Sequence, residues 1–284
     1  MIQNFRYRLC ELFGIPLYLD FSLIFLLLFF VFSGGGFHEG IVCAALLLFS
    51  IAAHELGHAL TARAFGYPTR DITLSLLGGC ASLVALPRKA WQEFLTAFAG
   101  PGVSFILAVL GAFFISLAAD SPVLDAICYV FNSALHHFGI NVMLGNGLPA
   151  SACNTLLVNT LAYFSIINLI LGIFNLLPGF PMDGGRIFRS ALTPFIGRVK
   201  ATYYAMIVGR GFAIMLGLDG IWRVMNGLSW GLVTILIAWM IWKEGYREYL
   251  MARMESMWGF DDYRAKASPP PYGGRGGESD VGRD

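Results

Sequence analysis

Residues 41–61 read IVCAALLLFSIAAHELGHALT, a run of apolar side chains that contains His54, Glu55 and His58. Ionisable side chains in so apolar a run are costly unless they pair with one another or bind something. On a helix, residues four apart lie on one face, so both imidazoles can point toward one metal ion. Glu55 follows His54 directly and can reach a water molecule at that metal. The stretch therefore predicts a buried helix that carries a metal site.

The composition of the whole chain places this helix in a membrane. Of the 284 residues, 57% are hydrophobic and 13% are charged, and the mean hydropathy is +0.67. These values are too apolar for an ordinary soluble domain. The net charge is +1 and the basic residues form no cluster, so the sequence gives no support for a nucleic-acid partner. The lipid bilayer is the partner that the composition indicates.

The sequence predicts a membrane all-α fold with about six transmembrane helices. A helix crosses the hydrocarbon core with about 20 apolar residues. The segments that meet this requirement are 17–33, 41–64, 92–118, 155–177, 202–218 and 228–242. We expect the first of them to be retained, because the Ser-Gly-Gly-Gly that ends it does not resemble a signal-peptide cleavage site.

Lysine and arginine are sorted to one side of the predicted helices. They occur before the first helix, between the second and third, between the fourth and fifth, and after the sixth. The segments 34–40 and 119–154 contain none, and the segment between the fifth and sixth helices contains only Arg223. By the positive-inside rule both termini are cytoplasmic, and we expect a multi-pass protein of the plasma or inner membrane of the cell.

Three further segments complete the predicted organisation. Residues 71–86 alternate apolar and polar side chains around a Gly-Gly pair, which predicts a short β-hairpin on the cytoplasmic side. The external segment 119–154 has room for a surface helix but not for an inserted domain. We expect residues 1–262 to form one membrane domain with its core at 41–186, and the proline- and glycine-rich residues 263–284 to form a disordered cytoplasmic tail.

A hydrolytic zinc site usually has three protein ligands, so a third ligand must join the two histidines. At 1.5 Å per residue, His54 lies about 20 Å and His58 about 26 Å along a helix that crosses about 30 Å of hydrocarbon. Asp183 follows the fourth predicted helix on the same side and at a similar depth. Glu93 also lies on this side, but we expect it to be a helix N-terminal charge.

The sequence around Asp183 has its own physical interpretation. Pro178 and Pro181 cannot continue a helix, so the fourth helix should end there. The Gly-Gly pair at 184–185 permits backbone angles that turn Asp183 toward the histidines. The alternative is that Asp183 only caps the helix that follows.

Residues 54–58, His-Glu-x-x-His, and residues 175–184, Asn-x-x-Pro-x-x-x-x-Asp-Gly, together resemble the motifs of the site-2 protease family of intramembrane zinc metalloproteases. The resemblance extends from the second predicted helix to about residue 186. It implies one Zn²⁺ per chain. The roles that it implies are zinc ligands for His54, His58 and Asp183, catalytic base for Glu55, and substrate binding for Asn175, whose alternative is a helix-end hydrogen bond.

Two departures from the family pattern are visible. The family often has Gly-Pro-x-x-Asn between the two motifs, whereas residues 100–104 place Ser104 at the Asn position, which puts a polar role there in doubt. Neither a peptide-binding domain in the external segment nor nucleotide-sensing modules at the C-terminus fit this chain. The sequence thus predicts a compact form that a regulatory membrane partner could control.

The predicted function is proteolysis of a membrane-spanning, regulatory protein, within or near its transmembrane segment and toward the cytoplasmic face. Such a substrate must unwind locally, and the predicted hairpin offers a strand edge to it. The alternative is a membrane transporter of metal ions or solutes that uses an intramembrane His and Asp site. Against the transporter, Glu55 lies where a general base belongs, and the chain shows no internal repeat.

Overall fold

The computed structural model describes residues 6–21, 23–24, 27–28, 31, 37–75, 78–83, 89–137, 144–145, 147–149, 155–227 and 230–258. The helices are α2 (Phe37–Ala64), α3 (Ala90–Ala119), α4 (Val123–His137), α6 (Leu156–Asn175), α7 (Asp183–Ile196), α8 (Arg198–Met225) and α9 (Trp230–Trp258). The strands are β1 (Arg6–Leu12), β2 (Ile15–Asp20), β3 (Thr69–Ser75) and β4 (Gly78–Leu83). The predicted tail at 263–284 lies outside the described residues.

Within the described part of the chain, α2, α3, α6 and α8 are long and apolar enough to cross a membrane. They correspond to four of the six predicted transmembrane helices. Helix α9 covers the predicted segment 228–242 from Trp230 onward, but it carries charged side chains from Lys243 and is not among these four. The count of six therefore stays a prediction.

The predicted first transmembrane helix is wrong at its start. Residues 17–20 belong to strand β2, in which Ile15, Leu17 and Leu19 are buried and alternate with half-buried neighbours. This period of two is the signature of a strand with one face in a core. The apolar residues of the strand lead directly into an apolar segment, so hydropathy alone assigns them to a helix. Most of residues 22–36 lie outside the described residues.

The predicted hairpin is confirmed as strands β3 and β4, but it is half of a larger sheet. The strand order is β1-β2-β3-β4. The outer pairs are antiparallel, and β2 runs parallel to β3. Parallel neighbours need a long crossover connection, and α2 lies in the one that joins β2 to β3. Residues 84–86 of the predicted hairpin lie outside the described part.

The sheet packs against α2. Leu17, Ile72 and Leu74 of the sheet are at most 2% exposed and share a hydrophobic core with Ile51 and Ala59 of α2. These α2 residues flank the His-Glu-x-x-His segment. The sheet therefore supports the part of α2 that carries the ionisable side chains.

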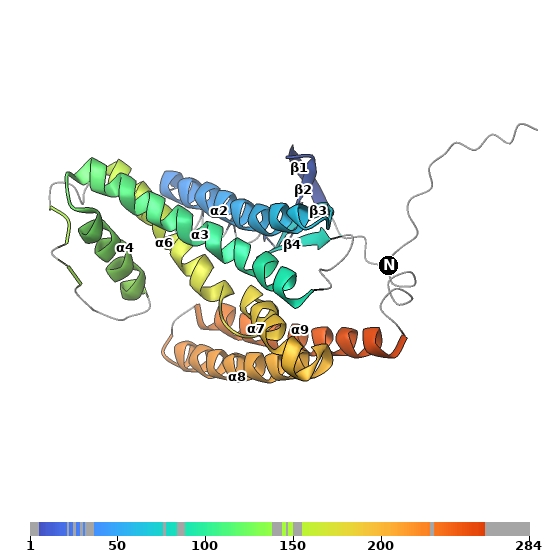
Figure 1. Cartoon of the computed structure of the whole chain (residues 1–284). Helices are drawn as coiled ribbons and strands as arrows, with labels where there is room; N and C mark the ends of the chain where they lie inside the picture. Colours follow the sequence, from blue (N-terminus) through green and yellow to red (C-terminus); the bar gives the residue numbers. More distant parts are fainter. Residues whose placement is uncertain are drawn as a thin grey trace, which may run out of the picture.

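The helices form two groups (Figure 1). Helices α2, α3 and α6 lie side by side, and α8 pairs with α9 below them, with α7 packed between α3 and α8. The sheet lies beside the C-terminal part of α2, and α4 lies at the opposite end of the molecule. We call these two regions the sheet end and the α4 end.

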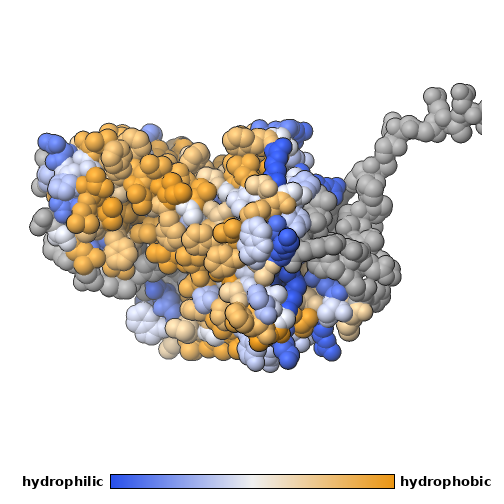
Figure 2. Space-filling view, viewed as in Figure 1, coloured by the Kyte–Doolittle hydropathy of each residue, from blue (hydrophilic) through white to orange (hydrophobic). Residues whose placement is uncertain are grey.

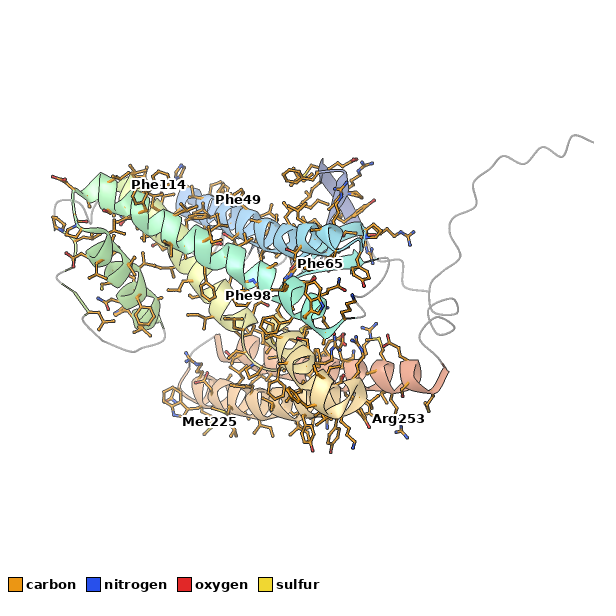
Figure 3. All side chains as sticks on the ribbon, viewed as in Figure 1. Phe49, Phe65, Phe98, Phe114, Met225 and Arg253 are labelled. Carbon is orange, nitrogen blue, oxygen red and sulfur yellow. The ribbon has the colours of Figure 1, made fainter. Side chains whose placement is uncertain are left out.

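The outer surface of the helices is apolar. Phe49 on α2 and Phe98 and Phe114 on α3, labelled in Figure 3, are 57%, 43% and 51% exposed. Figure 2 shows hydrophobic residues over much of this face, with many of the hydrophilic ones gathered toward the sheet end. An apolar surface of this extent marks contact with a membrane. The chain is an integral membrane protein.

Candidate metal site

The His-Glu-x-x-His segment lies on α2 in the half next to the sheet. His54, Glu55 and His58 are 2%, 4% and 7% exposed. One ligand atom from each of the three lies within 4.8 Å of the others. The segment packs closely on α3, because a Cβ atom added at Gly57 would lie 2.8 Å from the carbonyl oxygen of Ala99. Three buried ionisable groups therefore face one small volume.

Asp183 reaches this volume from a helix more than a hundred residues further along the chain. Its Oδ2 lies 3.1 Å from Nε2 of His54 and 3.0 Å from Nε2 of His58. The two Nε2 atoms are 3.2 Å apart. The three atoms form a nearly equilateral triangle. Zinc bonds of about 2.0–2.1 Å in a tetrahedron place neighbouring ligand atoms about 3.3 Å apart, so the triangle fits a zinc ion.

The outer nitrogens of both imidazoles are held by α3. His58 Nδ1 lies 2.7 Å from the carbonyl oxygen of Thr96, which can only accept, so this nitrogen carries the proton. His54 Nδ1 lies 2.9 Å from Oγ of Ser104. With Nδ1 donating, each Nε2 keeps its lone pair for a metal. Two lone pairs and a carboxylate oxygen at this spacing repel one another unless a cation lies among them.

Ser104 has the polar role that its departure from the family pattern put in doubt. It is fully buried and bonds to His54. Ser104 on α3 thus holds the His54 ring in an orientation that leaves Nε2 facing Asp183 and His58. The bond from Nδ1 of His58 to the carbonyl oxygen of Thr96 was missed by sequence reasoning, because a backbone carbonyl leaves no residue-specific signal.

Gly100 lies directly against the two imidazoles. A Cβ atom at this position would be 2.2 Å from Nε2 of His58 and 2.7 Å from Nε2 of His54. Real Cβ atoms do not approach other atoms so closely. Pro101 follows it inside α3. The residue without a side chain therefore creates the space in which the ligand atoms meet.

The helix breaks between α6 and α7, where the prolines predicted it. Helix α6 ends at Asn175 and α7 begins at Asp183. The N-cap residue of α7 is Met182, whose side chain makes no capping hydrogen bond, and Asp183 is the first residue of the helix, so Asp183 is not its N-cap. The negative charge of Asp183 at a helix N-terminus is electrostatically favourable.

The glycines at 184 and 185 serve a different purpose from the predicted one. Neither has a positive φ angle. Instead, a Cβ atom at Gly184 would lie 2.2 Å from the carbonyl oxygen of Leu177, and one at Gly185 would lie 2.7 Å from the backbone carbon of Gly179. The pair allows the start of α7 to pack onto the preceding turn. This close packing brings Asp183 to the histidines.

Asn175 is the last residue of α6 and is 9% exposed. Its Nδ2 donates to the carbonyl oxygen of Leu171 in the same helix, at 3.0 Å. The structure thus contains the helix-end hydrogen bond that was the alternative interpretation. A contact of Asn175 with substrate stays a prediction.

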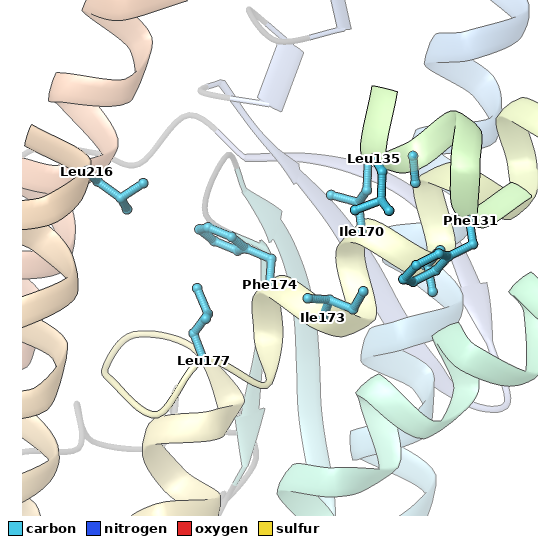
Figure 4. Close-up of a pocket in the computed structure, with 9 residues that line it drawn as sticks. Phe131, Leu135, Ile170, Ile173, Phe174, Leu177 and Leu216 are labelled. Carbon is cyan, nitrogen blue, oxygen red and sulfur yellow. The ribbon is translucent and has the colours of Figure 1, made fainter. Parts of the chain in front are cut away.

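A separate cavity lies toward the α4 end, between α4, α6 and α8. Its volume is 310 Å³. The residues that line it are all apolar: Phe131, Ala134, Leu135, Leu169, Ile170, Ile173, Phe174, Leu177 and Leu216 (Figure 4). None of these lining side chains could bind a metal, and the cavity is separate from the group of His54, Glu55, His58 and Asp183.

A His-Glu-x-x-His segment on a helix that is long and apolar enough to cross a membrane, with a carboxylate from α7 beside it, defines the class of membrane proteins with a metal site. The model of peptidase family M50 matches residues 42–218. The chain is 32% identical over 268 residues to a zinc metalloprotease of Methanocaldococcus jannaschii, covering 93% of this chain and 66% of that one. It is 34% identical to a Synechocystis homologue, covering 84% and 58%.

The fold agrees with this match. The solved structure of the site-2 protease from Methanocaldococcus jannaschii superposes with a TM-score of 0.57 at 28% identity, covering 86% of this chain and 95% of that one. The chain therefore belongs to peptidase family M50, and its resemblance to site-2 proteases is confirmed. It spans about three fifths of the length of the two curated relatives. Zinc is the metal named for the relative from Methanocaldococcus.

Proposed function

We propose that this protein is an intramembrane zinc metalloprotease that cleaves a membrane-spanning protein within or near its transmembrane segment. The observation that carries the proposal is the triangle of Nε2 of His54, Nε2 of His58 and Oδ2 of Asp183, with sides of 3.0–3.2 Å. These three residues would hold one Zn²⁺. The carboxylate of Glu55 lies in the same group of ligand atoms.

The chemistry follows from these positions. Zinc, when bound by these residues, would supply Lewis acidity to the scissile carbonyl and to a water molecule. Glu55 accepts the proton of that water and delivers it to the leaving amine. Ser104 and the carbonyl of Thr96 keep the two imidazoles in the orientation that presents Nε2. Burial of the site excludes bulk water and strengthens these electrostatic interactions.

The substrate reaches the site as an extended segment. A helix hides its carbonyl groups in its own hydrogen bonds, so the segment must unwind before cleavage. Strand β4 pairs only with β3 among the described strands, and it contacts α2. Its open edge can add the substrate as a further strand. Asn175 lies at the end of α6 and can turn its amide from Leu171 to the substrate backbone.

The orientation in the membrane follows from charge. The positive-inside rule places the sheet end and both termini in the cytoplasm, with α4 on the opposite side. The cut is then made toward the cytoplasmic face of a plasma or inner membrane. Residues 1–262 act as one protease domain, residues 263–284 form a tail, and a membrane partner regulates access to the site.

The alternative function, transport of metal ions or solutes, does not explain the carboxylate of Glu55 beside the ligand atoms. The two functions predict different results for one reconstituted preparation. Full-length protein in liposomes with a single-span substrate should cleave it, stop when a chelator removes zinc, and resume when zinc is added back. Mass spectrometry of the products should place the cut within or next to the transmembrane segment. Flux of metal ions without cleavage would support transport instead.

A further inference from the structure

A group of charged side chains, two of them buried and three partly buried, joins four helices near the candidate metal site. We call it the ion cluster, and its members are Glu93 of α3, Arg189 of α7, Arg198 of α8, and Glu248 and Glu255 of α9. Glu93 is 4% exposed and Arg189 is 3% exposed. Glu93 lies in the first turn of α3, as expected for a helix N-terminal charge, and it also pairs with two arginines.

The geometry of the ion cluster is centred on Glu93. Its Oε1 accepts hydrogen bonds from Nε and Nη2 of Arg189, the first at 2.9 Å. Its Oε2 accepts a bond from Nη1 of Arg198 at 2.8 Å. The remaining Nη1 of Arg189 donates to Glu248 at 3.1 Å, and Nε of Arg198 lies 3.7 Å from Glu255. Each arginine thus connects α3 to α9.

A buried ion pair adds little to the free energy of unfolding. The cost of removing two charges from water is large, and well-packed apolar side chains often stabilise a protein as much or more. An ion pair with several hydrogen bonds supplies a fixed geometry. The planar guanidinium can donate to its partners in only a few arrangements. The ion cluster therefore fixes where α3 and α7 lie relative to one another.

Both helices carry parts of the metal site close to the pair. Glu93 lies one turn before Thr96, whose carbonyl accepts the bond from His58. Arg189 lies on α7, which begins with Asp183. The guanidinium of Arg189 is also 5.0 Å from the ring centroid of Phe180, which is 1% exposed in the turn before Asp183. Arg189 thus contacts both α3 and the turn that delivers the third ligand.

We propose that Glu93 and Arg189 are positioning residues of the zinc site, and that their ion pair sets the distance between the Asp183 carboxylate and the two imidazoles. This inference rests on the proposed function, because it assigns the pair to the same site. Glu248 and Glu255 extend the effect to the C-terminal half of α9, which is held against α7 and α8 by the same arginines. Loss of Glu248 leaves the Glu93 bonds of Arg189 in place, so its effect is smaller.

The test measures metal binding and metal geometry in full-length purified protein. Glu93→Gln and Arg189→Gln should weaken zinc binding about 10–100-fold in a chelator competition, the range found for partners that orient metal ligands. The visible absorption spectrum of the cobalt-loaded protein should change, because it reports ligand geometry. Arg189→Lys, which keeps the charge, should recover part of the affinity. Glu248→Gln should fall between the wild type and Glu93→Gln.

Asp219→Asn is the matched control. Asp219 pairs with Arg223 near the C-terminal end of α8, in an ion pair that is about one third or more exposed. This variant should bind zinc as the wild type does. A role in folding alone would lower the melting temperature of Glu93→Gln and leave zinc affinity and the cobalt spectrum unchanged, and that result would overturn the proposal.

Two further outcomes separate the inference from the proposed function. A wild-type protein that binds no zinc, or an Asp183→Ala variant that binds it as tightly as the wild type, contradicts the proposed function itself. Zinc binding that depends on Asp183 but not on Glu93 or Arg189 contradicts only the inference. If the variants of Glu93 and Arg189 do not fold, the Glu248→Gln variant provides the test. A zinc affinity and a cobalt spectrum equal to those of the wild type in that variant would overturn the proposal.

Discussion

At the scale of single residues, the candidate metal site depends on a position of α3 that has no side chain, Gly100, as well as on the polar groups that α3 supplies. Gly100 makes room for both imidazoles, whereas Gly102, two residues further along the same helix, has its nearest side-chain atom 3.8 Å from the position of an added Cβ. Gly100 and Gly102 can therefore be compared as a test position and a matched control. One faces the ligand atoms and the other has space for a methyl group.

Gly100→Ala should weaken zinc binding at least tenfold, which corresponds to about 1.4 kcal/mol. The added methyl carbon would lie 2.2 Å from Nε2 of His58 and 2.7 Å from Nε2 of His54, far inside van der Waals contact, so the imidazoles must move. Gly102→Ala should bind zinc as the wild type does and gain up to about 1 kcal/mol of stability from helix propensity. Chelator competition on both variants measures the difference. Equal zinc affinity in the two would show that Gly100 does not shape the site.

Ser104 supplies the second prediction at this scale. Ser104→Ala removes the hydrogen-bond partner of His54 Nδ1 and should lower zinc affinity about 10–100-fold. Ser116→Ala, which removes a bond to the backbone carbonyl of Ser121 at the far end of the same helix, is the control. Zinc content after dialysis against a range of chelator concentrations reports the result. A loss of affinity as large in the control would mean that the serines act through general helix stability.

At the scale of helices, close backbone contacts hold the turn between α6 and α7 in place. Gly179 in this turn packs on Gly209 of α8, where an added Cβ would lie 3.1 Å from the Gly179 Cα and 3.3 Å from the amide nitrogen of Phe180. Backbone atoms cannot rotate out of the way as side chains do. Small residues allow such approaches between membrane helices. Helix α8 thereby supports the turn that ends at Asp183.

Gly209→Ala should destabilise the protein by about 1–3 kcal/mol, because the methyl group forces the turn away from α8. Gly211→Ala is the matched control, since nothing lies within 4 Å of an added Cβ there, and it should stabilise by up to about 1 kcal/mol. Thermal unfolding in detergent compares the two. A Gly209→Ala protein as stable as the Gly211→Ala protein would contradict this packing argument.

At the scale of the whole molecule, the metal-site residues were easier to predict than the sheet. Spacing on one helix and the proline-broken end of another were enough to predict that His54, His58 and Asp183 meet. Strand β2 was missed because Leu17 and Leu19 continue into an apolar segment that has the length of a transmembrane helix. Hydropathy averaged over a sequence window of transmembrane length cannot detect that buried and half-buried residues alternate in the few residues at the edge of the window.

The ion cluster could not be predicted for a different reason. Glu93 and Arg189 are 96 residues apart, and each has an ordinary explanation within its own helix. Only the packing of α7 between α3 and α8 brings them together. Pairings of this kind depend on tertiary structure, which local patterns do not encode.

The central claim is that a zinc ion held by His54, His58 and Asp183 works with Glu55 to cut a membrane-spanning protein. The most direct measurement determines zinc content and cleavage of a single-span substrate in one preparation of each variant. Glu55→Gln should keep one zinc per chain and lose cleavage, and Asp183→Ala should lose both. Glu39→Gln, at the far end of α2, should keep both. Cleavage at the wild-type rate by the Glu55→Gln protein would contradict the account.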